Sequence, residues 1–292
     1  MVKMKYEKFS SILNTGLFAN AKINLLKSIA ESPQRYVGLF RSTKPSAKMR
    51  QNLSQSQEIK FGDAFEEIIK AYIEEYGYTN LERNIKDKNG NSFNIDQYFS
   101  VPEGHIFIEQ KVRDDHDSTK KQGQISNFEK KLDILLKQHA KGELTGIFYF
   151  IDPSFNKNKN YYNREINRLK ETKHKNLYLF YGNELFAHLQ HSETWSEICE
   201  YLEIWRKNIP DFPDTNFDLD PASTLSEIKN LDPILFKKIF ENRDLFRSTI
   251  ENIFPSRATL KLLLTFFAQQ AISDRRYSSL EKLLQSRLDE LD

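Results

Sequence analysis

Alternating and continuous hydrophobic runs predict paired β-strands in the middle of the chain. Residues 93–113 read FNIDQYFSVPEGHIFIEQKVR, with a turn at Pro102-Glu103-Gly104 between two runs rich in β-branched and aromatic residues. Such runs around a Pro- and Gly-containing turn are typical of an antiparallel hairpin. An earlier run, TNLERNI, is followed by KDKNGN, whose Asn-Gly pair is a strong hairpin signal. We therefore expect three consecutive antiparallel strands.

Helical periodicity is found on both sides of these strands. Apolar residues recur at helical spacing over residues 58–76 and again over 121–139. Residues 144–152, LTGIFYFID, form a continuous apolar run, which is typical of a buried strand. A strand, a helical crossover and a further strand make a right-handed parallel connection. A fifth strand is predicted over 176–182, with helices over 183–190 and 194–207.

The two ends of the chain are predicted to be helical. Residues 5–32 have helical spacing with a break near 14–16, and the polar segment 41–57 is expected to be a loop or an exposed helix. The Pro- and Asp-rich stretch 209–221 is the clearest linker. We expect a helical N-terminal extension (1–57), a core (58–208) and a helical C-terminal subdomain (222–292). The fold class is α/β (α+β), with a mixed central sheet and flanking helices.

The predicted strand pairing places three polar side chains on one surface. Glu109 and Lys111 are two residues apart on one strand, so they point the same way, and Asp96 lies on the strand before it. Two carboxylates are suitable oxygen ligands for Mg²⁺. A nearby ammonium can orient a water molecule or stabilise the charge that develops on a phosphate. The alternative is an ordinary salt-bridged hairpin.

These residues carry a family resemblance. The signature of the PD-(D/E)xK nucleases is matched by Asp96, Glu109, Gln110 and Lys111, although Ile95 stands where the family often has Pro. The continuation KVRDDHDSTKKQGQ resembles that of type II restriction endonucleases. The predicted order of helix, three strands, helix and strand is similar to the αβββαβ core of these enzymes. The resemblance implies a type II site-specific deoxyribonuclease that hydrolyses double-stranded DNA with Mg²⁺ and leaves 5′-phosphate ends.

The same resemblance implies roles for individual residues. Asp96 and Glu109 would bind the metal, and Lys111 would position or activate water. Family members carry a helix before the strands whose Glu often joins the metal site. The run GDAFEE makes Glu66 the candidate here, with Glu67 or Asp63 as alternatives.

An acidic tract follows the third strand. Residues 114–117, DDHD, are expected to form a turn and helix cap, with metal ligation as the alternative, and Ser118 or Thr119 is expected to cap the next helix. Cations and amides near a helix N-terminus can reach phosphates and base edges. The candidate DNA-binding residues are Arg113, Lys120, Lys121, Gln122, Gln124 and Asn127.

Composition is that of a globular protein, with 39% hydrophobic and 29% charged residues. No apolar run is long enough to span a bilayer, so no membrane partner is expected. The start of the chain lacks the apolar segment of a secretion signal, and a single cysteine excludes an internal disulfide. We therefore expect a cytoplasmic location. The net charge of +2 does not itself indicate a nucleic-acid-binding protein. Two basic clusters, 41–60 and 157–175, could contact phosphates or could be solvated surface.

The expected partner is double-stranded DNA. By resemblance, a palindromic target would call for a two-fold symmetric homodimer, and a cognate DNA methyltransferase would complete a restriction-modification system. Two alternatives remain open. One is a repair or structure-specific PD-(D/E)xK nuclease with the same residues, and the other is a non-enzymatic DNA-binding or protein-binding module.

Overall fold

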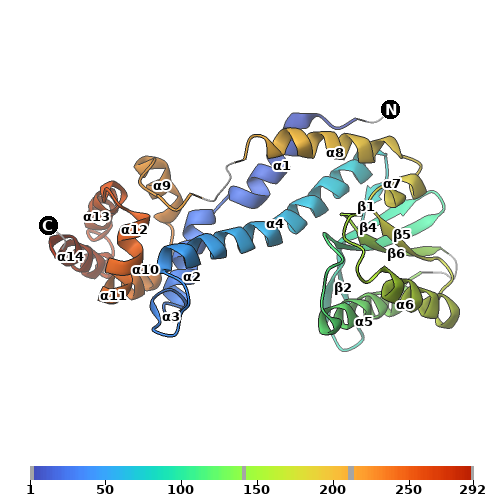
Figure 1. The fold of residues 1–292 in the computed structure, drawn as a ribbon, viewed down its shortest axis with the longest axis horizontal. Coiled ribbons are helices and arrows are strands. Elements are labelled where there is room, and N and C mark those ends of the chain that lie inside the picture. The colour runs from blue at the N-terminus through green and yellow to red at the C-terminus, as the bar shows by residue number, and fades with distance from the viewer. Residues whose placement is uncertain (1–2, 140–142, 210–213, 291–292) are drawn as a thin grey trace. The chain divides into compact units, whose positions relative to one another are not determined.

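A computed structural model describes residues 3–139, 143–209 and 214–290 (Figure 1). The chain divides into two compact units, one made of residues 1–16 and 61–209 and the other of residues 17–60 and 210–292. Helix α4 (Pro45–Glu75) contributes to both units. None of the helices in the described ranges is both long and apolar enough to cross a membrane.

The first unit is built on a five-stranded mixed sheet. In spatial order its strands are β1 (Thr79–Asn80), β4 (Gln97–Val101), β5 (Gly104–Lys111), β6 (Leu144–Phe150) and β7 (Leu177–Tyr181). The pairs β1–β4 and β4–β5 are antiparallel, whereas β5–β6 and β6–β7 are parallel. The predicted fold class is confirmed, and so is the parallel crossover from β5 to β6.

The predicted three-strand meander is present but interrupted. The expected first strand divides into β1 and β2 (Asn84–Lys86), and the expected second strand divides into β3 (Ser92–Asn94) and β4; β2 and β3 form a separate ribbon. The interruption falls at Asp96. Its carbonyl accepts a hydrogen bond from the Arg83 guanidinium (Nη1 to O, 2.9 Å). A side chain therefore replaces a strand partner at this point.

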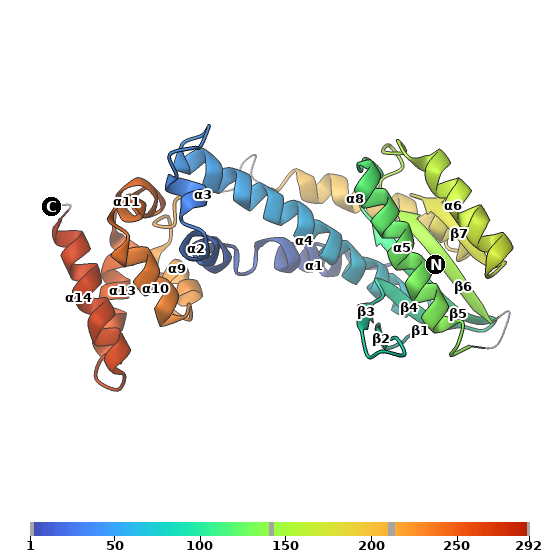
Figure 2. The ribbon, with the colours of Figure 1, turned by 90° about the horizontal axis from the view of Figure 1, so that it is seen from below.

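Helices cover both faces of this sheet. The crossover helices α5 (Ser118–Leu135) and α6 (Lys159–Thr172) lie on one face, while the C-terminal part of α4 and α8 (Glu193–Arg206) lie on the other (Figures 1 and 2). The core under α5 and α6 is strongly aromatic because rings from the strands stack on rings from the helices. It includes Phe107, Phe128, Phe148, Phe150 and Tyr162. The remaining helices of this unit are α1 (Tyr6–Phe18), apart from its last two residues, and α7 (Glu184–His188).

The second unit is helical and has its own core. It contains α2 (Ala21–Glu31), α3 (Gln34–Val37), the start of α4, α9 (Pro221–Ile228), α10 (Pro233–Glu241), α11 (Arg243–Leu245), a π-helix (Phe246–Ile250), α12 (Glu251–Ile253), α13 (Ala258–Gln270) and α14 (Arg275–Asp289). Between residues 222 and 290 the structure contains helices and no strand. The buried core of the second unit includes Leu25, Ile29, Phe236, Phe267 and Leu284.

Two helix boundaries differ from the expectation. The break in the first helical stretch falls at Asn20, not at 14–16, because Asn20 adopts a left-handed conformation (φ 59°) that asparagine tolerates. The helix expected to start at residue 58 starts at Pro45 and continues without interruption to Glu75, so most of the polar segment 41–57 is helix, one of its two expected states. Proline is favoured in the first turn of a helix, where its missing N–H costs nothing.

The tight link between β4 and β5 depends on Gly104, and we predict that Gly104→Ala is strongly destabilising. Gly104 has φ 138°, and a Cβ there would lie 2.2 Å from the main-chain oxygen of Glu143. We expect the free energy of unfolding to fall by about 3 kcal/mol. Gly90→Ala is the matched control, since Gly90 has φ 82° but open space around it, and should cost only about 1 kcal/mol. Urea denaturation measures both, and equal losses would contradict the role of this close approach.

Candidate active site

The site is centred on the carboxylate of Asp96, which the backbone of the neighbouring strand holds in place. Asp96 directly precedes β4 and is only 8% exposed. Its Oδ2 accepts a hydrogen bond from the main-chain N–H of Gln110 on β5 (2.7 Å). Burial and the nearby Glu109 carboxylate raise the pKa of Asp96. The position of this carboxylate is therefore set by strand pairing and not by a flexible loop.

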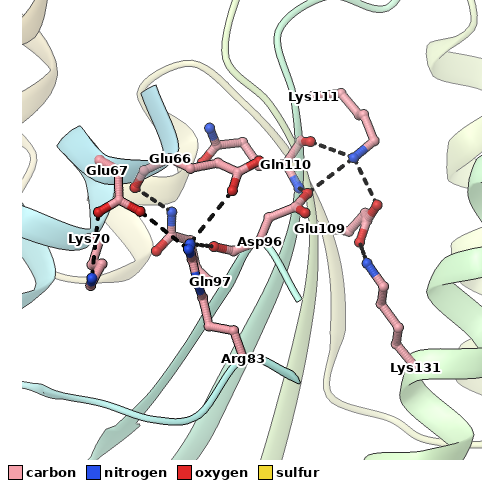
Figure 3. Close-up of polar contacts among 10 residues, drawn as sticks. All are labelled: Glu66, Glu67, Lys70, Arg83, Asp96, Gln97, Glu109, Gln110, Lys111 and Lys131. Carbon is pink, nitrogen blue, oxygen red and sulfur yellow. Dashed lines mark hydrogen bonds and ion pairs between the residues drawn. The ribbon is translucent and has the colours of Figure 1, made fainter. Parts of the chain in front are cut away.

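The Lys111 ammonium joins the two carboxylates (Figure 3). Its Nζ lies 2.8 Å from Glu109 Oε1 and 3.1 Å from Asp96 Oδ2, and it also donates to the carbonyl of Gln110 (2.7 Å). Burial alone would lower the pKa of Lys111, but the carboxylates of Glu109 and Asp96 raise it to about 12. The structure thus brings together the three residues that the sequence predicted to share one surface.

Lys131 is a further member of this cluster that the sequence analysis missed. It lies on α5, is 3% exposed, and donates from Nζ to Glu109 Oε2 at 2.5 Å. Glu109, itself 3% exposed, is therefore held between two ammonium groups. Burial would raise the pKa of Glu109, but Lys111 and Lys131 together lower it. The signal in the sequence was a lysine at helical spacing from Phe128 on the apolar face of α5.

Glu66 lies near the cluster without contacting it directly. Its side chain is 22% exposed and its Oε2 is 3.6 Å from Arg83 Nη1. The Gln97 amide donates to the main-chain oxygen of Glu66 (2.7 Å), which ties α4 to β4. Burial, and then the charge of Asp96, raise the pKa of Glu66 to about 8, against the opposing effects of Arg83 and Lys111. Electrostatically, Glu66 is coupled to the site.

The two alternatives to Glu66 are placed differently. The Glu67 side chain is 47% exposed, and it pairs with Arg83 Nη2 (3.2 Å) and with Lys70 (3.5 Å). Asp63 lies one turn earlier on α4 and acts on Glu66 only through its charge. Neither alternative is shown in contact with the Asp96, Glu109 and Lys111 cluster in the described residues.

The donor atoms at this site suit a hard divalent cation. Asp96 and Glu109 direct carboxylate oxygens to one point, and Mg²⁺ prefers oxygen ligands. The Oε1 atoms of Gln97 and Gln110 are buried and accept no hydrogen bond from the described residues. In the part of the chain that the structure describes, no three His, Cys, Asp or Glu side chains group as a metal site. The Lys111 ammonium lies at the point where the two carboxylates converge.

The acidic tract after β5 is structural. Asp117 caps α5 by accepting from the N–H of Lys120 (2.8 Å), so the expectation of a Ser118 or Thr119 cap was wrong, because both residues already lie in the helix. Asp114 is fully buried and accepts from the N–H of Asn158 and the hydroxyl of Tyr181, each at 2.9 Å. The tract therefore ties the end of β5 to the segment before α6.

The candidate DNA-binding residues surround the same end of β5. The Arg113 guanidinium lies over the ring of Phe155 (5.6 Å), and Lys121 lies over the ring of Tyr161 (4.8 Å) while donating to Asn158 (3.1 Å). Gln124 is engaged inside the unit, because its Oε1 accepts from the Tyr162 hydroxyl (2.6 Å). Of the other candidates, Lys120 and Gln122 are exposed and Asn127 is half-buried.

Comparison with known families matches the central part of this chain. Residues 77–206 match the family model described as "Type II restriction endonuclease, HinfI". The resemblance to type II restriction endonucleases is thereby confirmed over this segment. The matched residues run from just before β1 through α8, and they include Asp96, Glu109, Lys111 and Lys131 but not Glu66. At the level of the family, the match supports a nuclease.

Other comparisons add little. No curated protein matches the chain. Among solved structures, the chain is similar to Can2 from Sulfobacillus thermosulfidooxidans in complex with cyclic tetra-adenylate, with 14% sequence identity and a TM-score of 0.31. The alignment covers 67% of this chain and 55% of that chain. A likeness of this size carries no argument about function.

We predict that Glu66 makes stability depend on pH. Its pKa is about 8 in the folded protein and 4.5 ordinarily, so between these pH values the folded state binds more protons at Glu66 than the unfolded chain does. The free energy of unfolding should therefore fall as pH rises through this window. Glu66→Gln should make the fall shallower, whereas Glu67→Gln, a change on the exposed neighbouring carboxylate, should leave it unchanged. Urea denaturation at a series of pH values measures this, and identical slopes for wild type and Glu66→Gln would refute it.

We also predict that Lys131→Met is strongly destabilising. The substitution removes one of the two cations that compensate the buried Glu109 carboxylate. Breaking a buried pair by removing one partner costs about 3 kcal/mol or more. Lys130→Met is the matched control, because Lys130 is exposed on the same turn of α5, and it should change the free energy of unfolding by less than about 0.5 kcal/mol. Thermal and urea unfolding of the two variants compare the sites directly, and similar stabilities would show that Glu109 does not need Lys131.

Proposed function

We propose that this chain is a Mg²⁺-dependent type II restriction endonuclease that cleaves double-stranded DNA at a short recognition sequence. One observation carries the proposal. Two buried carboxylates, Asp96 and Glu109, converge on the Lys111 ammonium, within the segment that matches the restriction endonuclease family. A salt-bridged hairpin alone does not require both carboxylates to be almost completely buried, at 8% and 3% exposure.

The residues have distinct roles in this proposal. Asp96 and Glu109 would hold Mg²⁺, which supplies Lewis-acid polarisation of the phosphate and a more acidic bound water. Lys111 would orient the attacking water and stabilise the negative charge that builds up on the phosphate oxygens. Glu66 is the further candidate carboxylate, because it is the helix residue coupled electrostatically to Asp96.

Lys131 would act through Glu109. Because its Nζ donates a hydrogen bond to Glu109 Oε2, the other oxygen of that carboxylate, Oε1, is left to face Lys111. Interactions behind a ligand that fix its orientation are commonly as important as the ligand itself. Lys131 is therefore a positioning residue in this proposal.

Hydrolysis would proceed by in-line attack of water at phosphorus. The bond from phosphorus to the 3′ oxygen breaks, the 3′ oxygen takes up a proton, and a 5′-phosphate is left on the other fragment. Around the end of β5, Arg113, Lys120 and Lys121 would neutralise backbone phosphates, while Gln122 and Asn127 would be available to base edges. Gln124 would support this surface through its bond to Tyr162.

The remaining partners follow from the type of enzyme. A homodimer would match both strands of a palindromic target. A cognate DNA methyltransferase would protect the host DNA, and both enzymes would act in the cytoplasm as a restriction-modification system.

We predict that wild-type protein with Mg²⁺ cuts plasmid DNA into discrete fragments, and that Asp96→Ala and Lys111→Ala abolish cutting. The first change removes a metal ligand and the second a stabilising charge, and losing one such group typically slows a reaction by about 10²–10³-fold or more. Asp115→Asn is the matched control, since that carboxylate lies just beyond β5 but is 42% exposed, and it should cut normally. Gel electrophoresis of the products is the measurement.

Each outcome of this assay separates the candidate functions. A smear without discrete bands would indicate a nuclease for repair or for branched DNA. Cutting by Lys111→Ala at the wild-type rate would reject the proposed site. Intact plasmid in every lane, across several DNAs, would favour a binding module whose carboxylates are structural.

A further inference from the structure

We propose that Leu39 and Phe40 form an apolar wedge that enters a groove of double-stranded DNA, with flanking cations on the phosphates. The wedge lies at the tip between α3 and α4, residues 38–44, in the helical unit and not in the unit that contains Asp96 and Lys111. The inference rests on the proposed function only in taking DNA as the partner.

The exposure of the two side chains is the first observation. Leu39 is 90% exposed and Phe40 is 97% exposed, and the two are adjacent in the chain. In the same unit, neighbouring aromatic and aliphatic residues such as Tyr36 and Met49 are almost completely buried. Contiguous large apolar residues left in water are characteristic of binding sites.

The tip is anchored to the core on the α3 side. Tyr36 of α3 is buried in the core of the helical unit, and its hydroxyl is hydrogen-bonded to Ser28 (3.0 Å). At Gly38 a Cβ would come within 2.5 Å of the Gln34 carbonyl, so the chain can turn this closely only at a glycine. The Arg41 guanidinium donates to the same carbonyl (3.3 Å) and closes the turn from the other side.

The tip is also anchored on the α4 side. Helix α4 starts at Pro45, and Met49 and Leu53 of its first turns are buried in the same core as Tyr36. Only seven residues, 38–44, lie between the two anchored helices. Both views show this segment projecting beyond α3 (Figures 1 and 2). The structure thus presents the apolar pair on a short, held turn.

The charge of the segment around the tip indicates a polyanionic partner. Residues 32–57 contain five Lys or Arg side chains and no Asp or Glu, in a chain whose net charge is +2, so the rest of the chain has a net charge of −3. Within the described residues, none of the five forms an ion pair with a carboxylate. They are Arg35, Arg41, Lys44, Lys48 and Arg50. A run of cations without intervening acids is complementary to a polyanion.

The combination of residue types favours a duplex groove over other polyanionic surfaces. Proteins that enter the minor groove insert Phe or Leu against the base steps, while adjacent Arg and Lys contact the groove and the phosphates. Leu39 and Phe40 have this arrangement, with Arg35 on one side in sequence and Arg41 and Lys44 on the other. A DNA-cleaving enzyme gains from such a contact because the extra interface adds affinity without occupying the cleavage site.

The test measures binding of the full chain to a mixed-sequence DNA duplex, without divalent metal so that the DNA stays intact. Fluorescence anisotropy over a series of NaCl concentrations gives both the affinity and its salt dependence. Leu39→Ser with Phe40→Ser should weaken binding about tenfold, as expected for loss of one base-contacting aromatic group, with no change in the salt slope. Arg41→Ala with Lys44→Ala should instead reduce the log–log salt slope by about 1.8, since two phosphate contacts are lost.

Ile272→Ser is the matched control. Ile272 is also 90% exposed in the helical unit, but it lies beside Asp274, whose carboxylate pairs with Arg276 (2.7 Å). The control should bind DNA like the wild type. Because Leu39 and Phe40 are exposed, their double variant should unfold at the wild-type temperature, which separates a lost contact from a lost fold.

An unchanged DNA affinity in the Leu39→Ser, Phe40→Ser variant would overturn the wedge. If that variant also loses self-association in sedimentation, the tip is assigned to a protein contact. The cleavage assay remains independent, since wild-type protein that binds DNA through the tip but cuts nothing would reject the nuclease and keep the wedge.

Discussion

A carboxylate removed from water needs compensating charge, and in this protein that requirement falls on Glu109. Its two oxygens are occupied by ammonium groups from different elements, Lys111 on its own strand and Lys131 on the crossover helix. The contact between Glu109 and Lys131 fixes the rotation of α5 about its axis, because Lys131 reaches Glu109 when Phe128 and Leu132 face the sheet. Lys111 in turn reaches Asp96, which is bonded to the backbone of β5. Packing and electrostatics therefore select one arrangement of strand and helix.

Much of the first unit could be predicted from local patterns. The continuous apolar runs of β5 and β6, the amphipathic period of α5 and the turn at Gly104 are short-range signals, and each leads to the observed element. The division of the first two strands could not be predicted, because it depends on Arg83 reaching the carbonyl of Asp96 across the fold. The early start of α4 was uncertain for the opposite reason, since polar residues 45–57 have little apolar periodicity to indicate a helix.

Prediction of the site residues from the sequence has the same limit, because local spacing does not reveal contacts made by packing. Asp96, Glu109 and Lys111 were found together because strand alternation converts spacing into shared direction. Lys131 lies 22 residues from Glu109 in the chain, among the apolar residues on one face of a helix. Its role appears only when the helix is packed against the sheet. The same holds for Asp114, which in sequence resembles a metal ligand and in the structure joins two chain segments through Asn158 and Tyr181.

The helical unit is assembled from two separated stretches, residues 17–60 and residues 210–292, and the segment that matches the restriction endonuclease family lies between them in sequence. Synthesis on the ribosome makes these stretches at different times. The sheet segment that contains Asp96 and Lys111 is complete while the core that anchors Tyr36 and Met49 still lacks Phe236 and Phe267. A nascent or truncated chain thus has Asp96, Glu109 and Lys111 in place before it has a fully supported tip at 38–44.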